Sequence, residues 1–298
     1  MTTTVRSPLP TVPPGTPLLG EVITWTCPAK AVRHADLVAA LRSAALDEKV
    51  ARALAPRHAF TRACRKLARA RVIRPLAETE ATITFQFTAE SRAGDKYEYT
   101  LETLLALDKK TGAVTCDLPG LATLAQDELA RCLEHRTGGD VTRVVQKLFD
   151  RQADLFAIRE AGGCYFVPVV HTPLVDRVQT FLDRLNGRLG RFPVPAGTAE
   201  GDRSVREAVA CGLAAVIAEY RAAVSGFDAD TKKETLERAA EKIRRTRLKV
   251  EGYAEYLADE RGRLDRELTA AQTDLRARVA ALADNAGAGA PAVAGGAA

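Results

Sequence analysis

The chain has 298 residues, room for roughly two domains, and its apolar fraction of 46% can form hydrophobic cores, which excludes disorder throughout. Its 43 basic and 38 acidic residues give a net charge of +5, too small an excess for a dedicated nucleic-acid coat protein. Ala, Leu and Val dominate the apolar residues, so the composition favours helices.

The first 18 residues contain five prolines and lack the apolar core of a signal peptide, so we predict a disordered leader over 1–18. We find no run of the about 18–20 apolar residues that a membrane span needs. The six cysteines and four histidines are scattered, without the spacing of a zinc site. We therefore expect a cytoplasmic protein with no membrane contact, no metal and no cofactor.

Residues 19–118 are predicted to form an α+β domain. A short strand over Gly20–Cys27 precedes a helical region in pieces from His34 to about Ala70. The hydrophobic period then changes to two, as expected for strands. Short polar turns between three such segments predict an antiparallel meander, with the preceding helices covering one face. The predicted strands are Thr82–Thr88, Lys96–Leu107 and Ala113–Cys116.

Residues 119–198 are predicted to form a second module of helices and a β-hairpin. A helix over Leu121–His135 is followed by another that Asp140 caps and that runs to about Ala153. The hairpin over Leu155–Pro168 turns at Ala161–Gly163, and a further helix covers Pro173–Asn186. The order helix, helix, hairpin is that of a winged helix, and it occurs in the first domain too.

Residues 199–284 are predicted to be a helical arm. From about Asp230 to Asp284 the apolar residues follow a nearly heptad repeat, interrupted on the seam by Arg247 and Arg261. This pattern predicts either a coiled-coil arm or an antiparallel helical hairpin. We expect self-association or docking of a protein partner through residues 228–284. Residues 285–298, rich in Gly and Ala, are predicted to be a disordered tail.

The most distinctive feature is the segment Arg57–Arg74, which holds seven cations and no acidic residue. On a helix, four of these cations share one face, as expected for a helix that contacts the phosphates of DNA or RNA. The alternative is a solvated basic face or a surface that docks an acidic partner. The candidate nucleic-acid-binding residues are Arg57, Arg62, Arg65, Lys66, Arg69 and Arg71.

A second basic stretch, Lys242–Lys249, carries five cations within the helical arm. It would bind phosphates or an acidic partner, or pair with an antiparallel neighbouring helix. No phosphate-binding loop, dinucleotide fingerprint, nucleophile elbow or zinc-protease motif occurs in the chain. Asp108–Gly112 resembles an aspartyl-phosphate signature with one Lys too many, and Cys164 has no evident base nearby. We therefore expect a protein without enzymatic activity.

The sequence Gly162–Pro168 (GGCYFVP) follows an Arg-containing strand, and Ala59–Ala63 (AFTRA) lies in the basic helix. With these motifs the chain resembles an uncharacterised family of bacterial and phage proteins of about 300 residues that share this helix, this hairpin and a helical C-terminus. The resemblance covers most of residues 20–280 and implies architecture without an activity.

These patterns together predict an α+β protein that is non-enzymatic and associated with nucleic acid, with a helical arm for self-association. The alternative is a scaffold that binds protein partners through the arm, without nucleic acid.

Overall fold

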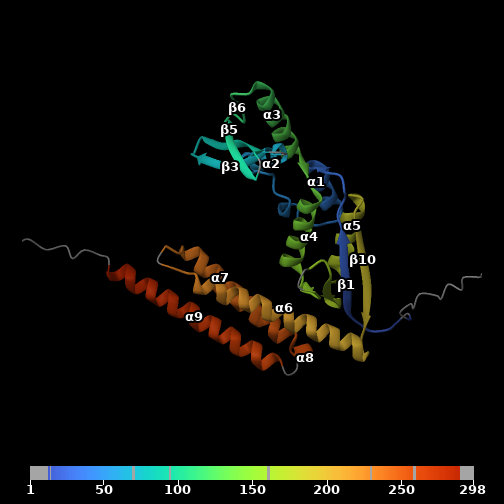
Figure 1. The fold of residues 1–298 in the computed structure, drawn as a ribbon. Helices are drawn as coiled ribbons and strands as arrows, with labels where there is room; N and C mark the ends of the chain where they lie inside the picture. The colour runs from blue at the N-terminus through green and yellow to red at the C-terminus, as the bar shows by residue number, and fades with distance from the viewer. Residues whose placement is uncertain are drawn as a thin grey trace, which may run out of the picture. The chain divides into compact units, whose positions relative to one another are not determined.

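The computed structural model describes residues 13, 15–68, 71–93, 95–159, 162–228, 230–257 and 260–288 (Figure 1). The fold is mixed α/β with antiparallel sheets, which confirms the class expected from the sequence. The chain divides into two units that are each discontinuous in sequence. The bundle unit comprises residues 1–24, 154–172 and 190–298, and the sheet unit comprises 25–153 and 173–189.

The sheet unit contains a four-stranded antiparallel sheet in the order β3-β4-β5-β6. Two helices lie against it (Figure 1), and their buried residues form one core with Phe85, Phe87, Leu105 and Leu107 of the sheet. The strands are β3 (Arg71–Glu78), β4 (Thr82–Ala93), β5 (Lys96–Asp108) and β6 (Val114–Cys116), and the helices are α2 (Pro56–Leu67) and α3 (Pro119–Glu134).

β3 was not predicted: the predicted helical region ends at about Ala70, and the residues between it and Thr82 were assigned to no strand. α2 ends at Leu67, and Arg71 begins an edge strand that pairs with β4. Pro75 explains the difference, because proline breaks a helix interior but is tolerated in an edge strand, where its missing N–H removes no ladder hydrogen bond. The sheet therefore has four strands instead of the predicted three.

The rest of the sheet unit is mainly helical, with one small two-stranded sheet, β2-β7. α4 begins with a capping box in which the Thr137 side chain is the N-cap and Asp140 stands at the third helical position. The sequence analysis had assigned the cap itself to Asp140. The elements are β2 (Val32–Arg33), α1 (His34–Ser43), the 3-10 helix η1 (Glu48–Val50), β7 (His135–Arg136), α4 (Gly138–Gln152) and α5 (Thr172–Arg184), which joins this unit from Pro173.

The bundle unit contains a second sheet, in the order β10-β1-β9-β8. Gly162 and Gly163, both with positive φ, lead into β9 as the predicted hairpin turn requires, while Ala161 of that turn lies outside the described residues. Glu21 is buried in this sheet, where Arg191 donates hydrogen bonds of 2.5 and 2.6 Å to its carboxylate. The elements are β1 (Leu18–Thr26), β8 (Phe156–Ala157), β9 (Tyr165–Pro168), the 3-10 helix η2 (Val169–His171) and β10 (Arg188–Pro195).

This sheet explains why the predicted module 119–198 is divided between the two units. β9 pairs with β1, about 145 residues earlier in the chain, with Gly20 opposite Pro168. The hairpin β8-β9 therefore belongs with the N-terminal strand, whereas α3, α4 and most of α5 belong to the sheet unit. A pairing over such a separation leaves no local pattern in the sequence.

The predicted arm is a set of helices packed within one chain (Figure 1). In place of the expected continuous helix there are separate helices, α7 ending at Gly252, the short α8, and α9 beginning at Arg261, and α7 and α9 pack against each other and against α6. Of the two predicted alternatives, the antiparallel helical hairpin is the one observed, and its buried seam residues include Ile243, Val250, Leu257, Leu264 and Leu268. The helices are α6 (Ala199–Ser225), α7 (Lys233–Gly252), α8 (Ala254–Leu257) and α9 (Arg261–Ala288).

α6 is long and apolar enough to cross a membrane by length and composition, which the sequence analysis had not anticipated. Its best 18-residue window has a mean hydropathy of 1.4, and 33% of that window is buried. Val209, Leu213 and Ile217 of this helix lie in the core shared with α7 and α9. A core helix of a soluble protein meets the same criterion, so the finding is weak evidence for a span.

Candidate anion-binding sites

Arg62, the central residue of the predicted basic face, is held by a carboxylate of the same unit. Its guanidinium donates two hydrogen bonds of 2.7 Å to the two oxygens of Asp140. The side chains are 29% and 11% exposed, so the pair is largely shielded from water. Bidentate pairs of this kind are among the strongest side-chain hydrogen bonds.

Three further candidate residues are also ion-paired. Lys66 lies 2.5 Å from Glu128, Arg57 lies 3.2 Å from Glu78, and Arg71, which stands on β3 and not on the helix, donates to Glu102 at 2.5 and 2.7 Å. Arg65 is exposed and has no ion pair with a described residue. Arg69 lies outside the described residues. Four of the six candidate cations are therefore ion-paired within the protein, and on the predicted helix face Arg62 and Lys66 are paired.

A cavity of about 180 Å³ opens where α2 and α3 meet, and two of the predicted residues line it. Arg62 and Lys66 of α2 converge there with Arg131 of α3 and His135 of β7. Sequence analysis did not associate Arg131 or His135 with the basic helix, because they lie about 70 residues further along the chain. Glu128 and Asp140 pair with three of these side chains, so the cavity is only partly cationic.

The environment of Asp140 makes the stability of the sheet unit depend on pH. Burial raises the pKa of this carboxyl, but hydrogen bonds from Arg62 and Thr137 outweigh burial and lower the pKa to about 2. The unfolded value lies near 3.9, so the ionised form stabilises the fold above that pH. As pH falls from about 4 to about 2, we expect a loss of about 2 kcal/mol. Urea unfolding over this range tests it, and Asp140→Asn should remove most of that slope.

A second feature of the sheet unit escaped the sequence analysis. On β5, Tyr97, Tyr99 and Leu101 are 57%, 59% and 57% exposed, which is unusual for three large side chains in a row. The alternation in Lys96–Leu101 (KYEYTL) was visible and predicted a strand, but it could not indicate which face another element covers. Every residue from Lys96 to Leu101 is exposed, so α2 and α3 cover neither face at this end of β5.

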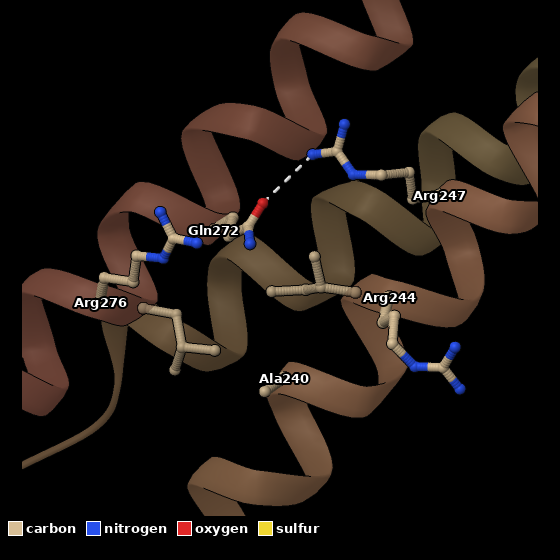
Figure 2. A pocket seen from close by; sticks show the side chains of 7 residues that line it. Ala240, Arg244, Arg247, Gln272 and Arg276 are labelled. Carbon is tan, nitrogen blue, oxygen red and sulfur yellow. Dashed lines mark hydrogen bonds between the residues drawn. The ribbon is translucent and has the colours of Figure 1, made fainter.

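The bundle unit contains a cationic groove between α7 and α9 (Figure 2). It encloses about 230 Å³ above the apolar side chains of Ile243 and Leu275. Arg247 donates a hydrogen bond of 3.3 Å to Gln272, and the guanidinium of Arg276 lies on the other side of this amide (Figure 2). Arg244 also lines the groove, although it pairs with Glu241 at 2.7 Å.

Every charged side chain that lines this groove is a cation. Arg276 is exposed and makes no ion pair with a described residue. Arg247 was noted in the sequence as an interruption of the apolar seam, and the structure places it half-buried at that position. Two guanidinium groups around one amide are suited to bind a carboxylate or a phosphate.

A buried acid in the bundle unit accounts for part of its polar interior. Asp154 accepts a hydrogen bond of 2.6 Å from the Tyr253 hydroxyl and an ion pair from Lys249, and His171 lies 3.5 Å away. Burial, followed by the hydrogen bond to Asp154, raises the pKa of Tyr253, so the hydroxyl stays protonated and donates. Asp154 satisfies Tyr253 and Lys249, whereas the buried Nε2 of His171 has no hydrogen-bond partner among the described residues. We interpret the cluster as structural.

Among the described residues, no group of three or more His, Cys, Asp or Glu side chains is placed to hold a metal ion. All six cysteines are free thiols, and burial raises the pKa of Cys64 to about 12. A thiol with so high a pKa is a poor nucleophile at neutral pH.

The fold and these sites define a mixed α/β protein with a helical bundle and cationic surfaces on both units. Residues 18–288 match a family of unknown function (DUF6744), and the chain belongs to this family. The match agrees with the expected resemblance to an uncharacterised family and adds no activity. Neither the curated proteins nor the solved structures contain a match to this chain. Function has to be argued from the chain's own residues.

Proposed function

We propose that the protein is a non-enzymatic, nucleic-acid-associated protein that contacts phosphates through its sheet unit. The distribution of charge carries this proposal. The sheet unit has 24 basic and 18 acidic residues, a net charge of +6, whereas the bundle unit has 19 and 20, a net charge of −1. The excess positive charge of the chain thus belongs to one unit, and such a surface attracts polyanions.

Within the sheet unit, Arg65 on α2 and Arg74 on β3 are the cations best suited to this role. Both are exposed, and neither has an ion pair with a described residue. Arg57, Arg62, Lys66 and Arg71 would first have to exchange a carboxylate for a phosphate, which reduces the gain from each contact. Arg69, which lies outside the described residues, remains a proposed phosphate-binding residue because of its position in the sequence.

The test is a charge-reversal pair that leaves the ion pairs of α2 intact. We expect Arg65→Glu with Arg74→Glu to weaken binding of labelled DNA at least tenfold and to reduce the slope of log affinity against log salt by about 2, since each phosphate contact contributes about 0.9. Fluorescence anisotropy at about 50 and 200 mM salt measures both quantities, with duplex and single strands compared.

The control reverses two exposed cations of the bundle unit, Arg221 and Arg238, neither of which pairs with a described residue. An equal loss of affinity in this control would mean that total charge, and not the sheet unit, drives binding. No binding by the unmodified protein at about 50 mM salt would end the proposal, because non-specific phosphate contacts are strongest at low salt.

A second candidate function is docking of an acidic protein segment on the bundle unit, and the groove of Figure 2 favours it. Its lining carries three arginines and no carboxylate. We expect Arg247→Glu with Arg276→Glu to abolish binding of a labelled oligoglutamate peptide, measured by anisotropy. Arg278→Glu is the control and should retain binding, because Arg278 is exposed, does not line the groove and lies two residues, about 200° around α9, from Arg276. Equal binding by all three proteins would exclude the groove.

We also propose self-association through residues 228–284, for which fewer surfaces are available than the sequence suggested. The seam residues of α7 and α9 are buried against each other and against α6, so an interface between copies would use the outer faces of these helices. Sedimentation velocity of the full chain tests it. Deletion of residues 228–298 is unsuitable for this purpose, because it would expose the buried residues Val209, Leu213 and Ile217 of α6.

A further inference from the structure

The sheet of the sheet unit has one covered face and one open face. Phe85, Phe87 and Leu105 point into the core that α2 and α3 complete. Residues directly opposite in antiparallel strands share a face, and Thr88 stands opposite Val72 on β3 and Leu101 on β5. Thr88 follows Phe87 in β4, so this second row belongs to the face that points away from the helices.

The register of β4 and β5 shifts between Phe87 and Thr88, where Glu102 is opposite no residue of β4, so the alternation along β5 changes face between Thr103 and Leu101. Tyr97 and Tyr99 continue the row of Leu101, since side chains two residues apart on a regular strand lie on the same face. Tyr97 is opposite Arg92 and Tyr99 is opposite Glu90. The rings are 57% and 59% exposed, and consecutive side chains on one face of a strand stand about 7 Å apart. The open face therefore presents two neighbouring aromatic rings to solvent.

Cations lie on the same face as these rings. Arg74 follows Val72 by two residues on β3, is exposed, and has no ion pair with a described residue. Arg92 stands beside Tyr97 and lies 3.8 Å from Asp95. Glu90, opposite Tyr99, adds an acidic side chain to this row. The face thus combines a cation that can contact phosphate, Arg74, with the aromatic surface of Tyr97 and Tyr99.

We propose that the open face of β3, β4 and β5 binds unpaired bases of single-stranded nucleic acid, with Tyr97 and Tyr99 stacking on bases and Arg74 contacting a phosphate. This inference rests on the proposed function and specifies its ligand. Aromatic rings on the open face of a four-stranded sheet are a known means of stacking single-stranded bases. A duplex hides the flat surfaces of its bases, so a flat sheet with exposed rings favours single strands.

The experiment measures the affinity of the full chain for a labelled oligothymidylate of about 12 nucleotides and for a duplex of the same length. We expect Tyr97→Ala and Tyr99→Ala each to weaken single-strand binding by about 5-fold to 100-fold. Tyr97→Phe and Tyr99→Phe should bind like the unmodified protein, because the ring is retained. The salt dependence of the alanine variants should be unchanged, since no phosphate contact is lost.

Leu124→Ala provides the control, because Leu124 is 57% exposed on α3 of the same unit and lies outside the open face. Tyr99→Trp gives an independent readout: its added fluorescence should be quenched by the single strand if a base stacks on the indole. Full single-strand affinity in the alanine variants, or equal losses in the alanine and phenylalanine variants, would overturn base stacking.

These outcomes separate the inference from the proposed function. If both alanine variants bind normally while Arg65→Glu with Arg74→Glu does not, the stacking inference fails and the phosphate-binding function stands. If the unmodified protein binds neither strand at low salt, the proposed function fails and the inference fails with it.

Discussion

Reversing the charge of Arg62 is expected to lower the free energy of unfolding of the sheet unit by about 4 kcal/mol. Removing one partner of a largely buried ion pair costs about 3–5 kcal/mol, because the other charge stays buried without compensation. In Arg62→Glu the new carboxylate would also face Asp140, whose oxygens now accept bonds of 2.7 Å from the guanidinium. Chemical denaturation with urea measures the change.

The matched control is Arg65→Glu, one turn away from Arg62 on the same helix. Its side chain is exposed without a partner among the described residues, so we expect a change within about 0.5 kcal/mol. Similar stability of the two variants would show that the Arg62–Asp140 pair contributes little. A loss of nucleic-acid binding in Arg62→Glu would be uninformative, because the variant is expected to be partly unfolded.

The contrast between Arg62 and Arg65 shows what the sequence reveals about the basic helix and what it does not. Helical period and composition predicted a helix in this region, and α2 forms there. The acids that neutralise its cations lie 62 and 78 residues away, at Glu128 and Asp140. Only the tertiary fold, in which α2 packs against α3 and Arg62 meets Asp140 of α4, brings them close, so no local pattern distinguishes a bound arginine from a free one.

The C-terminal helices were the most predictable part of the fold, for a physical reason. A seam of apolar residues at heptad spacing must be buried, and Ile243, Val250 and Leu257 are. The pattern could not decide between a partner helix from another chain and one from the same chain. The end of α7 at Gly252 and the apolar face of α6 decide it, and both depend on tertiary packing.

The open face of the sheet illustrates the opposite case. Alternation predicted β5 and would place Tyr97 and Tyr99 on the same face as the buried Leu105 and Leu107, but every residue from Lys96 to Leu101 is exposed. The register shift between Phe87 and Thr88 changes the face to which the β5 side chains point, and it cannot be read from the period of the sequence. The candidate base-stacking residues could therefore be found only from the structure.

Replacing Asp154 by alanine is expected to destabilise the bundle unit by about 3 kcal/mol. Asp154 lies just before β8 and joins it to α7, through a 2.6 Å hydrogen bond from Tyr253 and the ion pair with Lys249. The Asp154 side chain is only 15% exposed, so its loss would leave a phenol and an ammonium group partly buried without an acceptor. The Tyr253 ring also packs edge-on against Phe156 of β8, at 5.3 Å between centroids.

A graded series distinguishes the charge of Asp154 from its hydrogen bond. Asp154→Asn keeps an acceptor for the Tyr253 hydroxyl and loses only the pairing with Lys249, which is 42% exposed and to that extent solvated. We therefore expect Asp154→Asn to cost about 1–2 kcal/mol, between the unmodified protein and Asp154→Ala. Asp274→Ala, at an exposed position of α9, should change stability by less than about 0.5 kcal/mol. Equal unfolding midpoints for the alanine and asparagine variants would mean that the charge, and not the hydrogen bond to Tyr253, holds β8 against α7.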